Sequence, residues 1–177
     1  VYLYPMALSF IVTGTAWRWI LNPSLGLEKF AIDMGFETFT FDWLVTPGMS
    51  IYTIVIAGVW QSSGFIMAIF LAGLRSVDDE IIKAAKIDGA GLVAIYSKII
   101  LPMMRPVFMS AIVILVHLAI KSYDLVIALT AGGPGISSDM PAVFMTQMAF
   151  HRSEIGLASA SAIMMFLTVS ALSLIHI

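Results

Sequence analysis

Residues 43–74 read WLVTPGMSIYTIVIAGVWQSSGFIMAIFLAGL and contain no Asp, Glu, Lys or Arg. A helix needs roughly 20 mostly apolar residues to cross about 30 Å of hydrocarbon. This run remains long enough even if the helix begins after Pro47 and Gly48. In lipid a lone segment satisfies its backbone hydrogen bonds only as a helix. The stretch therefore predicts a spanning helix over about 50–74 in an all-α membrane protein.

Three further apolar stretches lie on either side of this run, at about 1–21, 103–129 and 155–177. They predict a helical bundle of about four transmembrane helices, forming one transmembrane domain over 1–177. Because the chain begins at Val1 and stops while still apolar, we expect a fragment that lacks N-terminal spans and a C-terminal tail.

The composition of the whole chain agrees with a membrane protein. Of its 177 residues, 60% are hydrophobic and 11% are charged, whereas soluble domains have about 45–50% apolar and about 25% charged residues. A soluble enzyme with so little charge could not cover its surface, and a nucleic-acid binder would need a basic face. These classes are excluded.

The basic residues indicate how the chain is oriented. Residues 75–105 hold five of the nine Lys and Arg residues, while residues 22–49 hold only Lys29 beside four acidic residues. Short loops rich in Lys and Arg remain in the cytoplasm. We therefore expect 75–105 to be a cytoplasmic loop and the other two connections to face outward.

The cytoplasmic loop has the pattern of a helix–turn–helix. Ser76, three residues before Asp79, predicts a helix cap, and Gly89 is placed to end that helix. A second helix is expected over 92–100, stopped by Pro102. The small pair Ala84-Ala85 would let another surface approach closely.

The loop carries the most specific motif of the chain. Lys83-Ala84-Ala85, Gly89 and Ile99-Ile100-Leu101-Pro102 resemble the EAA loop of ABC importer permeases, EAA-x3-G-x9-I-x-L-P, at every spacing. The runs IDGA, LPMMRP and LTAGGP resemble the carbohydrate (maltose/glycerol-phosphate-type) branch, and within it the glucose/mannose permeases. One position departs from the pattern, because Lys83 stands where the family has glutamate.

The resemblance implies the fold of a type I ABC importer permease with a cytoplasmic coupling helix. It implies a permease subunit that translocates a sugar, possibly glucose or mannose, in the cytoplasmic membrane of a bacterium or archaeon. Its partners would be cytoplasmic ATP-binding subunits, a second permease and an external sugar-binding protein. The residues that it assigns to coupling are Lys83, Ala84, Ala85, Asp88, Gly89, Ile99, Leu101 and Pro102.

The chain itself shows no phosphate-binding motif. It contains no G-x-x-x-x-G-K-[ST] run, and the glycines at 132–135 are typical of a tight external turn. The resemblance therefore implies that the chain is not an enzyme and holds no cofactor, with ATP and Mg²⁺ bound by a partner subunit.

Polar residues inside the expected spans are candidates for the substrate pathway. Trp60, Gln61 and Ser62 offer a ring, an amide and a hydroxyl, groups that suit a sugar. The spacing of Ser110, His117, Lys121 and Asp124 would place all four on one helix face. For each set a structural role stays open: interhelical hydrogen bonds for Gln61, Ser62 and His117, and outer-end positions reaching water for Lys121 and Asp124.

Other classes of function remain as alternatives. The twelve methionines and three histidines show no ligand spacing, so no metal site is expected. An ion channel would need a repeated filter or a ring of charges, which the chain lacks. An integral-membrane enzyme acting on lipid-linked substrates and an ABC permease for a non-sugar solute are the remaining alternatives.

Overall fold

The computed structural model describes residues 2–176, and no strand occurs among them. The all-α fold predicted from the sequence is confirmed. The helices, with η denoting a π-helix, are α1 Tyr4–Ala7, α2 Phe10–Ile20, α3 Leu27–Asp33, α4 Ser50–Arg75, α5 Asp79–Ile87, α6 Leu92–Ile95, η1 Tyr96–Ile100, α7 Leu101–Met103, α8 Arg105–Ile120, α9 Asp124–Leu129, α10 Pro141–Thr146, η2 Gln147–His151 and α11 Ile155–His176.

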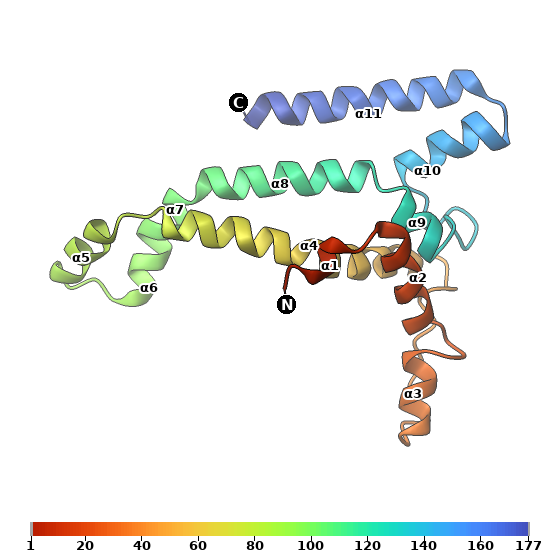
Figure 1. Ribbon diagram of the computed structural model, residues 1–177, viewed down its shortest axis with the longest axis horizontal. Helices are drawn as coiled ribbons and strands as arrows, with labels where there is room; N and C mark the ends of the chain where they lie inside the picture. The colour runs from red at the N-terminus through yellow and green to blue at the C-terminus, as the bar shows by residue number, and fades with distance from the viewer. Residues whose placement is uncertain (1, 177) are drawn as a thin grey trace.

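Three long helices, α4, α8 and α11, lie roughly side by side and define the long axis of the molecule (Figure 1). Helices α5 and α6 form one end, which we call inner after the orientation expected from the basic residues. Helices α2, α9 and α10 gather at the other, outer end, from which α3 projects sideways. The loop over residues 75–105 and the connections that contain α3 and join α9 to α10 therefore lie at opposite ends of the long helices.

By length and composition, α4 and the segment 155–174 of α11 are the two described helices able to cross a membrane. The pair 92–103 and 105–120, bent by 60°, would make a third span if it is counted as one. The structure thus has two such helices, or up to three, where the sequence predicted about four. The two expected segments that are not continuous helices, 1–21 and 103–129, each contain at least one break.

The first expected segment divides at Leu8 and Ser9, where the backbone is extended. Ser9 caps α2, because its hydroxyl accepts a hydrogen bond from the Val12 N–H at 3.3 Å. The break frees the carbonyl of Leu8, which accepts a hydrogen bond from the side-chain amide of Gln61 at 2.9 Å. A buried carbonyl without a partner is costly, so the distant Gln61 makes this break tolerable.

The third expected segment divides at both of its ends. Pro106 has no N–H and its ring would collide with the carbonyl four residues earlier in a continuous helix, so α8 restarts at Arg105 after a bend. At the outer end α8 stops at Ile120, and Asp124 opens α9, where the helix dipole favours an acid. The prediction that Ser110, His117, Lys121 and Asp124 share one helix face is therefore wrong, because α8 ends before Lys121.

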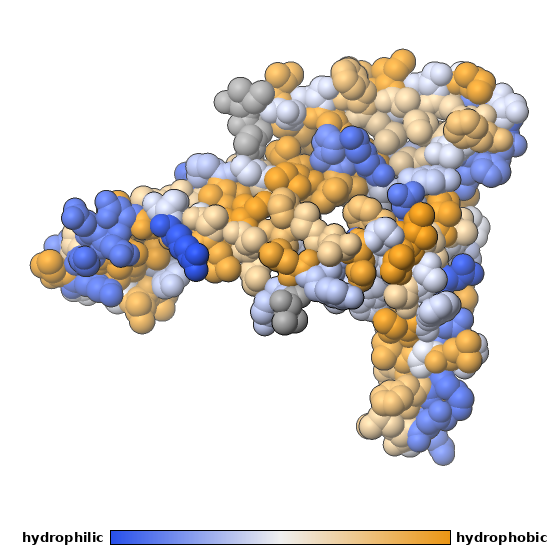
Figure 2. Space-filling view, viewed as in Figure 1, coloured by the Kyte–Doolittle hydropathy of each residue, from blue (hydrophilic) through white to orange (hydrophobic). Residues whose placement is uncertain are grey.

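Buried side chains gather in two clusters, one at each end of the long helices. The outer cluster joins α4, α9 and α10 and consists of Ile54, Ala57, Leu125, Val126, Leu129 and Val143. The inner cluster joins the inner ends of α4 and α8 to the helices of the cytoplasmic loop and consists of Val77, Ala85, Ile95, Ile100 and Met104. Between the clusters the long helices expose apolar side chains (Figure 2).

Two glycines let helices cross closely at the outer half. A Cβ on Gly14 of α2 would lie 2.7 Å from the Cβ of Ala128 on α9. A Cβ on Gly64 of α4 would collide with the backbone of Tyr2, next to α1. Small residues at such crossings are the usual means of close packing between helices in lipid.

We predict that Gly64→Ala destabilises the protein, because the collision is with backbone atoms that cannot rotate away. Gly58→Ala on the same helix is the matched control, since its Cβ would meet only the Leu125 side chain at 3.8 Å. Thermal unfolding in detergent should show a lower Tm for Gly64→Ala and none of this loss for Gly58→Ala. Equal Tm values would contradict the close crossing of the segment before α1 and α4.

Candidate coupling surface and substrate pathway

The loop over residues 75–105 begins with a cap that differs from the predicted one. Asp78 caps α5, because its carboxylate accepts a hydrogen bond from the Glu80 N–H at 2.8 Å. Ser76 instead donates its hydroxyl to the Gly73 carbonyl at 2.7 Å and closes the last turn of α4. The prediction of Ser76 as the cap was wrong by two residues, since α4 extends through Arg75 and occupies Ser76.

Gly89 ends α5 as predicted. Its φ of +81° is in the left-handed region that favours glycine, and it donates its N–H to the Lys86 carbonyl at 3.1 Å. The next residue, Ala90, returns a hydrogen bond to the Ala85 carbonyl at 2.9 Å. This closing geometry turns the chain sharply toward α6.

The second helix of the loop does not stop before Pro102, as was predicted. It passes through the π-helix η1 into α7 and ends at Met103. Pro102 has no N–H to donate to the Lys98 carbonyl and its ring crowds that carbonyl, and the wider π turn over 96–100 directly precedes it. The break comes at Met104, directly before α8, whose first turn contains Pro106.

The inner cluster fastens this loop to the long helices. Ala85 on α5 is buried with Ile95 and Ile100, and Phe70 of α4 and Val107 of α8 pack against the same cluster. Of the pair expected to let another surface approach, only Ala84 is exposed, whereas Ala85 is buried in the inner cluster. The helix–turn–helix is attached to both α4 and α8.

The opposite side of the loop exposes apolar side chains to the surroundings. Ile87 is 86% exposed and Val93 is 83% exposed, and Leu92 and Tyr96 are also exposed. We call these four residues the coupling tip. Figure 2 shows hydrophobic residues among hydrophilic ones at this end of the molecule. The sequence analysis missed the four residues, although their signal was present as apolar positions on both sides of Gly89.

The motif residues surround this tip to different degrees. Lys83, Asp88 and Gly89 are exposed on the same loop, as is Leu101, whereas Ile99 and Pro102 are half-buried. Ile99 packs against the inner cluster. The structure thus brings together part of the predicted coupling set at the surface and uses the rest to hold the loop in place.

The pathway candidates on α4 have different environments. The ring of Trp60 contacts that of Trp17 edge-on, with centroids 5.9 Å apart. Gln61 is only 5% exposed and its Nε2 holds the Leu8 carbonyl, while its Oε1 is buried without a partner among the described residues. Ser62 donates its hydroxyl to the Gly58 carbonyl of its own helix at 2.7 Å.

The candidates at the outer end of α8 do not form a cluster with these. His117 is half-buried in the last turn of α8, and Lys121 and Asp124 are both exposed, on either side of the break. Among residues 2–176 the one ion pair within 4.0 Å is Lys29–Asp33, so Lys121 and Asp124 do not pair. Their exposure favours the reading in which both reach toward water.

A recess that the sequence analysis missed lies between α9 and η2. It has a volume of about 410 Å³ and is lined by Tyr123, Ile127, Ala131, Thr146, Gln147, His151 and Arg152. Aromatic, amide, hydroxyl and cationic groups therefore meet at one hollow of the outer end. No sequence motif predicts this recess, because its residues come from two separate segments that the π turn of η2 and the break before α9 bring together.

Asp139 lies in the outer connection between α9 and α10. Its Oδ1 is buried without a hydrogen-bond partner among the described residues. Burial raises the pKa of this carboxyl, although the Met140 N–H and the charge of Arg152 act in the opposite direction. The structure describes no group of three or more His, Cys, Asp or Glu residues that could hold a metal ion.

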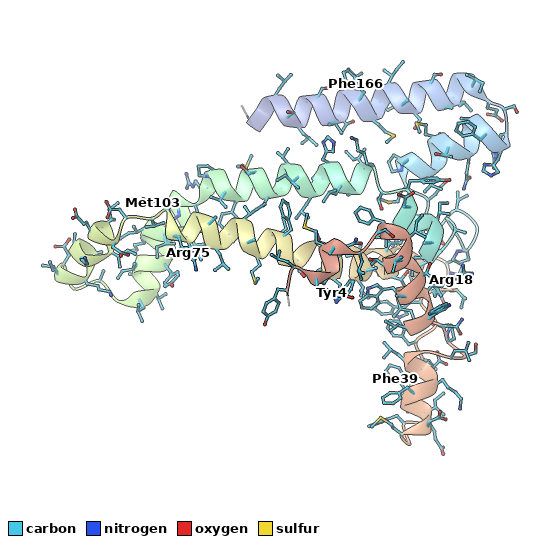
Figure 3. All side chains as sticks on the ribbon, in the orientation of Figure 1. Tyr4, Arg18, Phe39, Arg75, Met103 and Phe166 are labelled. Carbon is cyan, nitrogen blue, oxygen red and sulfur yellow. The ribbon has the colours of Figure 1, made fainter. Side chains whose placement is uncertain are left out.

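Figure 3 shows the side chains of the described residues on the ribbon. Arg75 closes α4 at the inner end, and Phe166 lies on α11, the most separate of the long helices. Long apolar helices with polar connections at both ends are the architecture of an integral membrane protein.

Comparison with known proteins assigns the family. The chain belongs to the binding-protein-dependent transport system inner membrane component family, whose model matches residues 5–177. It is 36% identical over 168 residues to a probable ABC transporter permease of Pyrococcus horikoshii, covering 94% of this chain and 58% of that protein. It is also 36% identical over 169 residues to the xylose/arabinose import permease XacH of Haloferax volcanii, covering 94% and 53%.

A third relative agrees with this assignment, and a solved structure shares the fold. The trehalose/maltose permease MalF of Thermococcus litoralis is 29% identical over 175 residues, covering 99% of this chain and 59% of that protein. A bacterial ABC transporter for import of the acidic polysaccharide alginate matches the fold with a TM-score of 0.82 at 18% identity, covering 99% of this chain and 62% of that one. The chain therefore spans between 53% and 62% of these proteins.

We predict that Asp139→Asn stabilises the protein at neutral pH. Because the folded state raises the pKa of this carboxyl, ionising it costs stability, and that cost appears as the pH rises above the ordinary pKa of an aspartate. The gain in Tm over the parent should therefore shrink as the pH falls toward that ordinary value. Asp42→Asn, at an exposed outer position, controls for the loss of one negative charge; a gain for Asp139→Asn that is independent of pH would contradict the argument.

Proposed function

We propose that this chain is the membrane-spanning permease part of an ATP-driven importer of carbohydrates. The observation that carries the proposal is the coupling tip, an exposed apolar surface on a loop that is firmly packed against α4 and α8. Apolar side chains exposed on a rigid element mark a surface for another protein. The motif around the tip is the one at which an ATP-binding subunit would dock.

The proposed mechanism follows from this packing. An ATP-binding subunit that moved the tip would also move Ala85 and the inner cluster, and with them the inner ends of α4 and α8. Packed interfaces shift between discrete arrangements rather than deform continuously. ATP and Mg²⁺ would be bound by that subunit, and this chain would take part in transport without catalysing a reaction. A second permease would complete the pathway, and an external binding protein would deliver the cargo.

The proposed cargo is a sugar. Relatives named for xylose and arabinose, for trehalose and maltose, and for sulfoquinovosyl glycerol support this class. Within it we propose glucose or mannose, on the sequence resemblance described above. The membrane would be the cytoplasmic membrane of a bacterium or archaeon, crossed several times by the complete protein.

We further propose that the cargo meets two groups of residues in this chain. At the outer end, Tyr123, Gln147 and Arg152 of the recess supply a ring and hydrogen-bond donors suited to sugar hydroxyls. Deeper along α4, Trp60 and the unpartnered Oε1 of Gln61 would follow, with Ser62, His117, Lys121 and Asp124 beside the route. The residues proposed for coupling are Lys83, Ala84, Ala85, Asp88, Gly89, Ile99, Leu101 and Pro102.

Charged substitutions at the tip test the docking. Ile87→Asp and Val93→Asp should each weaken association with the ATP-binding subunit by more than about tenfold, since 1.4 kcal/mol is tenfold and an unpaired buried charge costs more than that. Co-purification of the subunit with the complete permease from membranes measures the effect. Ile136→Asp, equally apolar and exposed on the outer connection, is the matched control. Unchanged co-purification with both tip variants would contradict the docking.

A panel of solutes tests the cargo. The complete complex in proteoliposomes, with its binding protein, should hydrolyse ATP faster when a sugar is present, with glucose and mannose giving the largest stimulation. The panel includes xylose, maltose, an anionic sugar, amino acids and inorganic anions. Stimulation only by a solute other than a sugar would leave the permease class intact but overturn the carbohydrate assignment, and turnover of a lipid-linked substrate by the permease alone would overturn the class.

A further inference from the structure

The connection between α2 and α4 forms an arm that the transport proposal does not use. It comprises residues 25–43, including α3, and projects sideways from the outer end at a steep angle to α4, α8 and α11 (Figure 1). If those three helices run along the membrane normal, the arm runs parallel to the membrane surface. Its level along the long axis falls inside the length of α11 and not beyond its outer end.

Helix α3 has one apolar and one polar face. Leu27, Phe30 and Met34, spaced three and four residues apart, share one side. Lys29 and Asp33 are on the opposite side and form an ion pair at 2.6 Å. Phe30 is 64% exposed and Met34 is 63% exposed, so the apolar face has no cover among residues 2–176.

The apolar face of α3 is turned toward the inner end of the molecule. In Figure 2 the hydrophobic residues of α3 follow its left edge, toward the inner end, while hydrophilic residues follow its right edge. The surface of the long helices on the same side is apolar as well. The arm therefore continues the apolar belt of the spans and holds its charges on the water side.

Two further features fit lipid as the neighbour. A groove of about 350 Å³ runs between the end of α2 and α3, lined by Trp19, Ile20, Leu25, Gly26, Leu27 and Phe30, and none of these side chains is charged. Aromatic rings line the segment that returns from α3 to α4: Phe39, Phe41 and Trp43 stack in sequence, and Trp43 contacts Tyr52 of α4 edge-on. Tryptophan and tyrosine favour the membrane–water interface.

The arm is held in this position by its own contacts. The Glu28 carboxylate accepts a hydrogen bond from the Phe41 N–H at 2.9 Å, which holds α3 against the segment that leads back to α4. The ring of Trp43 contacts Tyr52 of α4 at a centroid distance of 6.2 Å. A fixed amphipathic element in this orientation can bury its apolar face about 5–10 Å into the headgroup and acyl boundary.

We propose that residues 25–43 form an interfacial arm that lies in the outer leaflet, with Leu27, Phe30 and Met34 in the lipid and a phospholipid acyl chain in the groove beside Trp19. The arm would fix the depth and tilt of α2 and α4, which it joins. Lys29 and Asp33 would lie at the headgroups, and because the arm also carries Glu28, Glu37 and Asp42, its acidic balance would disfavour anionic lipid. This proposal does not depend on which solute is transported.

Residues 1–177 contain no cysteine, so a cysteine introduced here is the only one in this part of the permease, and any cysteine in the remainder is replaced by serine beforehand. Single-cysteine variants Phe30→Cys, Met34→Cys and Lys29→Cys are labelled with an environment-sensitive fluorophore in the complete permease, in phosphatidylcholine vesicles. Labels at 30 and 34 should show blue-shifted emission and lose most of it to phosphatidylcholine with a nitroxide near the headgroup end of its acyl chain. The label at 29, one residue away on the polar face, should instead lose its emission to aqueous iodide.

Two reference positions calibrate the result, Phe166→Cys on the exposed side of α11 for lipid and Asp79→Cys on the coupling loop for water. Iodide quenching at 30 and 34 as strong as at 79 would overturn the proposal, because the face would then be in water. Protection from both quenchers would also overturn it, because protein would then cover the face. Met34→Cys is the mildest replacement, so it preserves the test if Phe30→Cys fails to assemble.

Discussion

The packing of Ala85 against Ile95 and Ile100 is the interaction on which the rest of the structure depends. It joins the loop over residues 75–105 to α4 and α8, since Phe70 and Val107 pack against the same cluster. A larger residue at position 85 would push α5 away from the cluster. Without this contact the coupling tip would be a surface on a free hinge, and a subunit bound there could not move the spans.

The breaks in the helices are the second organising feature. Each one frees backbone groups that lipid cannot satisfy, and each is met by a polar group or a proline. Gln61 holds the Leu8 carbonyl, and Pro102 and Pro106 remove donors at the inner bend. At the outer break Asp124 opens α9, and Tyr123 beside it lines the recess. Polar chemistry is therefore concentrated where the helices are interrupted.

The sequence predicted what depends on local pattern. The all-helical fold, the helix over 79–87 and its end at Gly89 follow from apolar runs and from glycine chemistry close to one another in the chain. The break at Leu8 could not be predicted in this way, because the amide that satisfies it is 53 residues away. The cap was misplaced by two residues because the end of α4 competed for Ser76. The recess could not be predicted either, because it forms only where residues 123–131 meet residues 146–152, which are distant in the sequence.

Motif matching and geometry also differ in what they reveal about the coupling loop. The motif singles out Ala85 and Ile99, yet both pack in or against the inner cluster that holds the loop, whereas Ile87 and Val93 are exposed. A spacing motif does not distinguish residues that could contact a partner from residues that only support the loop. Burial distinguishes them, because a buried side chain cannot contact a partner directly.

Helix continuity then indicates which helix carries a movement outward. Both α4 and α8 contact the inner cluster, but α8 ends at Ile120 and passes through an irregular segment before α9. Helix α4 is continuous from Arg75 to Ser50, a length of about 39 Å at 1.5 Å per residue. It reaches the outer cluster through Ile54 and Ala57 and carries Trp60 and Gln61 between the two ends. In the proposed transport mechanism a movement of the tip would reach the outer recess through α4, because α9, which lines the recess, is buried against Ile54 and Ala57 in the outer cluster.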